Sequence, residues 1–134
     1  MTRKVDTEVR RRAGDACEYC RRPQAGTRIL FPIDHIIARQ HRGQTESENL
    51  ALACGHCNRH KGPNIAALDT ETNQLVPLFH PRRDRWSDHF SWHDKIIVGR
   101  TPVGRATADL LRMNDWQRIE MRENLQSLSE SFAG

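Results

Sequence analysis

Four cysteines have the type and spacing of a metal site. They form two Cys-x-x-Cys pairs, Cys17/Cys20 and Cys54/Cys57, with 33 residues between the pairs. Each such turn brings two thiolates to one point, and two turns together supply the tetrahedral sulfur set that Zn²⁺ favours. Because four thiolates leave no open coordination position, the predicted zinc is structural rather than catalytic. Two reactive Cys-x-x-Cys pairs, or simply buried thiols, are the alternatives.

A second group of residues, between and just after the cysteine pairs, suits hydrolytic chemistry. It contains Asp34-His35, Asn49 and Asn58. Aspartate and asparagine oxygens are hard ligands suited to Mg²⁺ or Mn²⁺, and a neutral His35 can take the proton of an attacking water. A metal held there would stabilise charge on a scissile phosphate. These residue types predict metal-assisted phosphodiester hydrolysis. The structural alternatives are a histidine satisfied at a strand end, a turn residue at Asn49 and a helix N-cap at Asn58.

Basic residues beside this group are predicted to bind nucleic-acid phosphates. The candidates are Arg39, Arg42, Arg59 and Lys61. Arginine accounts for 18 of the 21 basic residues in the chain, and its planar guanidinium suits bidentate phosphate contacts. A merely solvated charged face is the alternative for the same residues.

The order of these motifs resembles the HNH endonuclease family in its zinc-knuckle form. The matching pattern is Cys-x-x-Cys, Asp34-His35-Ile36-Ile37, Asn49-Leu50-Ala51-Leu52-Ala53 and Cys54-x-x-Cys57-Asn58-x-x-Lys61-Gly62, over roughly residues 10–63. The resemblance implies a ββα-metal fold, in which one hairpin strand carries the base and a following helix carries a metal ligand. It also implies an enzyme that cuts phosphodiester bonds of DNA, with RNA left open, and leaves a 5′-phosphate and a 3′-hydroxyl.

The resemblance further assigns a role to each candidate residue. His35 is the general base, and Asp34 and Asn58 hold one divalent cation. Asn49 fixes the loop that carries the base. The asparagine at position 58, where other members of the family have histidine, implies Mg²⁺ over softer metals, with Mn²⁺ as the other candidate.

Predicted elements around the site follow from periodicity and capping residues. We expect a helix over 7–14 with Thr7 as N-cap, strands over 28–34 and 50–53, a loop over 37–48 and a short helix over 55–61. Beyond the breaker cluster at residues 62–64, we expect strands over 75–79 and 95–98. A helix then starts at Thr101-Pro102 and runs to about Met113. The last helix spans 116–132.

The last predicted helix has an apolar face that needs a partner. Its apolar residues recur near the helical period at Trp116, Ile119, Leu125, Leu128 and Phe132. This face is expected to pack on the core or on a partner subunit, which allows a homodimer through the C-terminal helices. A protein–protein adaptor that uses this helix is a further alternative function.

Together these features predict an α+β protein with two parts. Residues 1–63 form a ββα-metal core stapled by the four-cysteine zinc site, and residues 64–134 form an extension of strands followed by two helices. The first part carries a net charge of +5 and the second −1. A second metal site among Trp86, Trp92, His80, His89 and His93 is possible, but irregular spacing favours core and hairpin residues there.

The composition excludes several classes of protein. The 134 residues include no stretch near the roughly 18 apolar residues of a membrane span, and the N-terminus has no hydrophobic segment of a signal peptide. We therefore expect a cytoplasmic protein with reduced cysteines and no membrane partner. The main rival to the nuclease is a non-catalytic, zinc-containing nucleic-acid-binding module.

Overall fold

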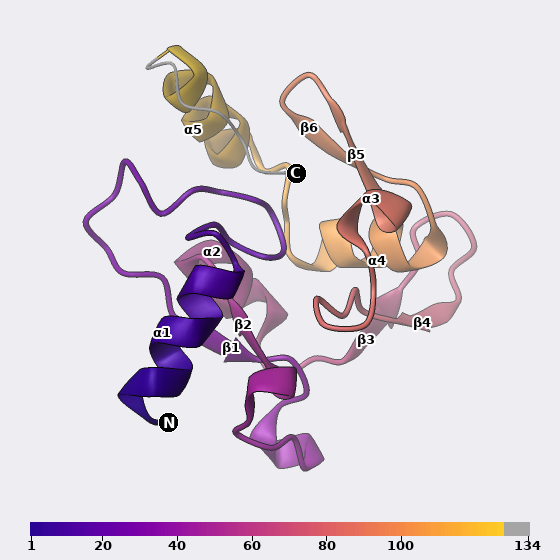
Figure 1. Ribbon diagram of the computed structural model, residues 1–134. Coiled ribbons are helices and arrows are strands. Elements are labelled where there is room, and N and C mark those ends of the chain that lie inside the picture. Colours follow the sequence, from indigo (N-terminus) through magenta and orange to yellow (C-terminus); the bar gives the residue numbers. More distant parts are fainter. Residues whose placement is uncertain (128–134) are drawn as a thin grey trace.

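The first half of the chain contains a β-hairpin followed by a helix (Figure 1). Strand β1 (Ile33–His35) pairs antiparallel with β2 (Leu50–Leu52), with Ile33 opposite Leu52 and His35 opposite Leu50. Helix α2 (Gly55–Lys61) follows directly, and Cys54 is its N-cap. The β2 residues are buried on both faces of the strand, which fits their continuous apolar run. This computed structural model describes residues 1–127.

The elements before this hairpin differ from the prediction. Helix α1 (Arg3–Arg12) begins earlier than predicted, because the hydroxyl of Thr2, not Thr7, caps it by accepting a hydrogen bond from the Val5 amide. Residues 28–32 are not a strand. The Gln24 side chain bonds the carbonyl of Ile29 and the amide of Phe31, so these backbone groups have a side-chain partner instead of a neighbouring strand.

The loop between β1 and β2 contains two short 3₁₀ helices, Arg39–His41 and Ser47–Asn49. It passes close to itself at Gly43, where an added Cβ would lie 1.7 Å from the carbonyl oxygen of Ile37. Any larger residue would push the two ends of the loop apart. The predicted loop over 37–48 is therefore an ordered turn structure.

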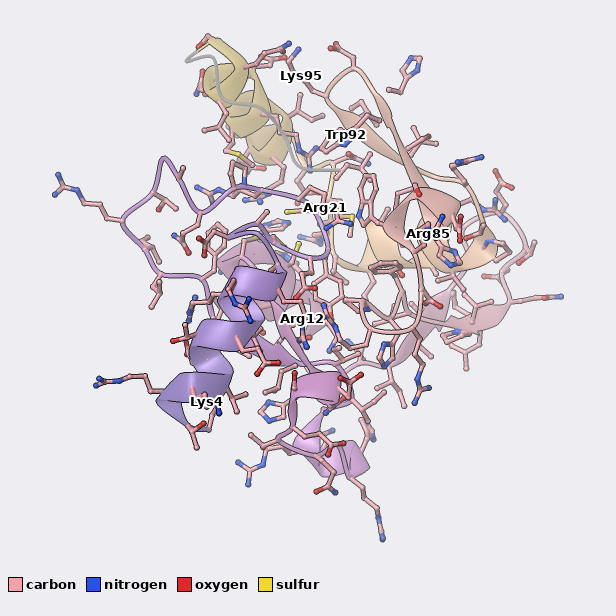
Figure 2. The ribbon with its side chains drawn as sticks, in the orientation of Figure 1. Lys4, Arg12, Arg21, Arg85, Trp92 and Lys95 are labelled. Atoms are coloured by element: carbon pink, nitrogen blue, oxygen red, sulfur yellow. The ribbon has the colours of Figure 1, made fainter. Side chains whose placement is uncertain are left out.

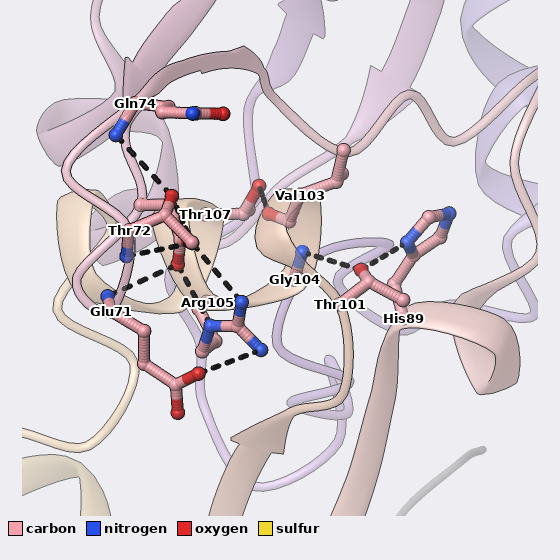
Figure 3. Close-up of polar contacts among 10 residues, drawn as sticks. Glu71, Thr72, Gln74, His89, Thr101, Val103, Gly104, Arg105 and Thr107 are labelled. Carbon is pink, nitrogen blue, oxygen red and sulfur yellow. Dashed lines mark hydrogen bonds and ion pairs between the residues drawn. The ribbon is translucent and has the colours of Figure 1, made fainter.

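The second half contains two more hairpins and three helices, and the α+β class is confirmed. The hairpins are β3 (Ala66–Leu68) with β4 (Leu75–Pro77) and β5 (Phe90–His93) with β6 (Ile96–Gly99). The helices are α3 (Trp86–His89), α4 (Pro102–Leu110) and α5 (Trp116–Ser127). Thr101 caps α4 as predicted, with its hydroxyl 3.0 Å from the Gly104 amide (Figure 3). Gly104 is required because a Cβ there would clash with the His89 carbonyl.

The predicted apolar face of the last helix is wrong in part. Leu125 is buried as predicted, but Trp116 is 68% exposed, and Arg118 and Arg122 are buried on α5 beside Leu125. The predicted positions Leu128 and Phe132 lie outside the described residues. The homodimer and adaptor hypotheses that used this face stay predictions.

One hydrophobic core includes residues from both sides of the predicted boundary at residue 63. Val9, Tyr19 and Leu50 share it with Phe79, Trp86 and Leu111. The Trp86 indole donates a hydrogen bond of 2.8 Å to the carbonyl of Tyr19, and an ion pair joins Arg82 to the buried Glu18. These contacts hold the extension against the ββα unit. Within residues 1–127, no helix has the length and apolar character to span a membrane.

Candidate functional site

The four cysteines lie together and are buried. Their sulfur atoms all fall within 4.8 Å of one another, and Sγ of Cys20 is 3.7 Å from Sγ of Cys54. Tetrahedral coordination with Zn–S bonds of about 2.3 Å needs sulfurs about 3.8 Å apart. The amides of Cys20 and Cys57 each donate to the first sulfur of their own pair. The cluster therefore fits a structural zinc site.

Charge around the sulfurs is uneven. Hydrogen bonds with the other thiols, that with Cys17 first, lower the pKa of Cys20, and the Arg118 guanidinium adds to this effect. Burial raises the pKa of Cys17. The sequence did not point to Arg118. It lies on α5, 98 residues after Cys20, and its guanidinium contacts the sulfurs of Cys20 and Cys54. The sequence feature that could have indicated this role is the presence of Arg118 on the same helix face as the predicted apolar residue Leu125.

Asp34 occupies the interior side of β1. Its carboxylate accepts 2.7 Å from the Tyr19 hydroxyl and 3.2 Å from the Lys61 ammonium. Burial raises the pKa of Asp34, while the Lys61 charge and these hydrogen bonds oppose the rise. A carboxylate has about four acceptor positions, so Asp34 retains lone pairs for a cation. Tyr19 is a second residue that the sequence did not point to.

His35 follows Asp34 and points to the other side of the strand. Its Nε2 lies 2.9 Å from the Thr45 hydroxyl, and no residue in the described part of the chain is hydrogen-bonded to Nδ1. Partial burial lowers the pKa of His35, and the nearby cations of Arg39 and Lys61 lower it further. The neutral form that a base requires is thus favoured near pH 7.

Asn58 lies one turn into α2, directly after Cys57. The N-cap alternative for this residue is wrong, because Cys54 caps the helix. None of the described residues is hydrogen-bonded to its side-chain amide. Asp34, His35 and Asn58 line one depression of about 330 Å³, together with Arg39. Asn58 directly follows Cys57 in α2, so the four-cysteine cluster and the depression share this helix.

Asn49 ties the ends of the β1–β2 loop together. Its Oδ1 accepts 2.8 Å from the Ile37 amide, and its Nδ2 donates 2.9 Å to the carbonyls of Ile37 and Gln44. These are the contacts that a loop-bracing residue needs. They hold the segment that follows His35 without touching the depression.

The four predicted phosphate-binding residues separate into two kinds. Arg39, Arg42 and Arg59 are exposed, and Arg39 borders the depression. Lys61 is 1% exposed, and its ammonium donates to Asp34 and, over 3.1 Å, to the His35 carbonyl. Against the prediction, Lys61 therefore faces inward, where it joins α2 to β1.

The histidines of the extension do not form a metal cluster. Nδ1 of His89 lies 2.6 Å from the Thr101 hydroxyl (Figure 3), and Nδ1 of His80 accepts from two backbone amides, while His93 is exposed. Within residues 1–127, the four cysteines are the one group of three or more histidine, cysteine, aspartate or glutamate side chains close enough together to hold a metal.

The hairpin, helix and four-cysteine cluster define a ββα unit of the HNH type, and comparison with known proteins agrees. Residues 17–64 match the HNH endonuclease family, which confirms over this segment the resemblance seen in the sequence.

Two curated relatives are similar to this chain. The Septu protein PtuA of Bacillus mycoides (strain KBAB4) is 27% identical over 63% of this chain, and the Septu protein PtuB of Bacillus thuringiensis is 22% identical over 90% of it. The chain spans 13% and 49% of the lengths of these two proteins. No solved structure matches the chain at a significant level.

Proposed function

We propose that this protein is a metal-dependent endonuclease that hydrolyses phosphodiester bonds of DNA. The observation that carries the proposal is that Asp34, His35 and Asn58 line one depression, beside the exposed Arg39. The match to the HNH family supports the same class of reaction. RNA shares the phosphodiester chemistry and is a second substrate to be tested.

Each residue of the depression has a part in the proposed reaction. Asp34 and Asn58 offer a carboxylate and an amide oxygen to one Mg²⁺ or Mn²⁺ ion, which when bound supplies charge stabilisation at the phosphate. Thr45 holds Nε2 of His35, so Nδ1 takes the proton of the attacking water. Arg39 contacts a phosphate next to the scissile bond, and Arg42 and Arg59 bind flanking phosphates.

One observation favours the rival function, a non-catalytic nucleic-acid-binding module with structural zinc. Asp34 is 5% exposed and already has Lys61 as its counter-ion. If Lys61 already neutralises Asp34, no cation needs to bind there, and the depression would bind a phosphate through Arg39 without a catalytic metal. The two functions differ in one measurable property, which is metal-dependent cleavage.

Plasmid nicking separates the two functions. The wild type is expected to nick supercoiled DNA with Mg²⁺ or Mn²⁺, and His35→Ala to lose about 100-fold or more in rate, because general-base catalysis contributes about 10²–10⁴-fold. His41→Ala, a substitution of an exposed histidine in the same loop, serves as matched control and should nick like the wild type. If all three proteins bind DNA equally in a low-salt gel shift and none nicks, the binding-module function is correct.

A further inference from the structure

Helix α5 buries a guanidinium against the cysteine cluster. Nη2 of Arg118 lies 3.4 Å from Sγ of Cys54 and 3.6 Å from Sγ of Cys20, and the residue is 7% exposed. One sulfur comes from each Cys-x-x-Cys pair. A single side chain, 98 positions from Cys20, therefore contacts both halves of the cluster.

The charge of a zinc-loaded cluster explains why a cation is buried there. Four thiolates and one Zn²⁺ carry a net charge of −2, because zinc-bound cysteines are deprotonated. A buried charge without a partner is costly, and hydrogen bonds between charged groups are about twice as strong as neutral ones. The guanidinium supplies both an opposite charge and N–H donors to the sulfurs.

Arg122, one turn further along α5, is buried for a different reason. It donates 2.6 Å to the Met113 carbonyl and 2.9 Å to the Lys95 carbonyl, and its guanidinium lies over the Trp92 ring. Trp92 and Lys95 both belong to the β5–β6 hairpin (Figure 2). Within the described residues, none of its N–H groups donates a hydrogen bond to a sulfur. The two arginines thus dock the same helix on two different surfaces.

We propose that Arg118 is the counter-ion of the zinc–thiolate cluster, so that zinc binding and docking of α5 stabilise each other. The coupling must be reciprocal, since it is an equilibrium between two binding events. The C-terminal helix is then part of the metal site rather than an independent appendage. This assignment does not depend on nuclease activity.

Zinc release from the full-length, zinc-loaded protein tests the proposal. Arg118→Met removes the charge and the donors while keeping a long side chain, and we expect zinc transfer to a metallochromic chelator to be about 10–100-fold faster. Arg118→Lys keeps a charge at the site and should fall between this variant and the wild type. Gln117→Met, at an exposed position of α5, is the matched control and should release zinc within about threefold of the wild-type rate. Arg122→Met loosens the docking of α5 without removing a sulfur contact, so it should speed zinc release less than Arg118→Met does.

Spectroscopy on the cobalt-substituted protein distinguishes a direct contact from a general loss of packing. Arg118→Met is expected to shift the thiolate-to-metal charge-transfer band, whereas Arg122→Met leaves it unchanged. In the reverse direction, zinc removal from the wild type should increase hydrogen exchange in α5. The proposal is overturned if Arg118→Met holds zinc as tightly as the wild type, or if Arg122→Met releases zinc equally fast and shifts the same band.

Discussion

Lys61 and Asp34 form an ion pair with almost no access to water. Their side chains are 1% and 5% exposed, and the Lys61 ammonium also bonds the His35 carbonyl. The pair connects helix α2, which carries Asn58, with strand β1, which carries His35. Since neither charge can turn to solvent, removing one of them leaves the other buried and unpaired.

The Lys61→Met substitution is expected to lower the free energy of unfolding by about 3–5 kcal/mol, as for other broken buried pairs. Urea denaturation of the zinc-loaded protein measures this loss. Lys95→Met is the matched control, because Lys95 pairs with the exposed Asp94 and such surface pairs contribute at most about 1 kcal/mol. The double variant Lys61→Met/Asp34→Leu should recover part of the lost stability, and strictly additive losses would contradict the coupling.

For the individual site residues, the sequence predicted which of them lie close together but not the direction in which each side chain points. The position of Asp34, His35 and Asn58 between and just after the cysteine pairs indicated a common site, and these three residues do line one depression. Lys61 was predicted to bind nucleic-acid phosphate because it is a basic residue beside the site, yet it is 1% exposed. Its partner is 27 residues away, and sequence spacing carries no information about such a contact.

Helices and strands that depend on residues a few positions away were predictable from the sequence. Those that depend on contacts with distant segments were not. The short helix after Cys54 and the α4 start at Thr101-Pro102 follow from capping residues within a few positions. Strands β3 and β5 exist because a partner strand pairs with each, and neither segment was predicted. The buried face of α5 was predicted only in part, because Arg118 contacts cysteine sulfurs and Arg122 contacts backbone carbonyls there, and neither contact can be read from apolar periodicity.

Helix α4 and the β3–β4 hairpin are joined by a charged contact. Arg105 on α4 donates over 2.8 Å and 3.0 Å to the two carboxylate oxygens of Asp69, which also accepts from Thr72 in the turn after β3 (Figure 3). The Arg105 hydrogen bonds hold the pKa of Asp69 well below its usual range. The ionised carboxylate therefore stabilises the folded state.

This contact predicts a pH dependence of stability. The folded-state pKa of Asp69 lies below its unfolded value near 3.8, so the stabilisation is complete above that value and is lost as pH falls toward the folded-state pKa. Asp69→Asn should melt at a lower temperature than wild type at pH 7, and the difference should shrink below about pH 4. Glu71→Gln is the control, because Glu71 is exposed and only touches Arg105 at 3.4 Å. A difference that stays constant down to pH 2 would contradict the role of the carboxylate charge.

The whole molecule has one core, although charge divides the sequence into two parts. Trp86 packs against Phe90 and Trp92, donates to the Tyr19 carbonyl between the first two cysteines and has the Arg21 guanidinium over its ring. Arg118 adds a contact from the opposite end of the chain to both cysteine pairs. The contacts of Trp86 with Tyr19 and Arg21, and those of Arg118 with the cysteines, cross the predicted boundary at residue 63. We therefore expect zinc binding and the fold of the extension to be lost together.

Two probes in one urea titration test this expectation. Zinc release, followed by a metallochromic dye, and helix loss, followed by far-ultraviolet circular dichroism, should have the same midpoint, because coincident transitions are the mark of a single cooperative unit. Trp86→Ala should lower both midpoints equally, at a cost of about 3–5 kcal/mol for a deleted buried aromatic side chain. If residues 1–63 formed an independent zinc domain, zinc release would occur at higher urea than helix loss. Trp86→Ala would then move only the circular dichroism transition, since the zinc cluster would no longer depend on the core that Trp86 completes.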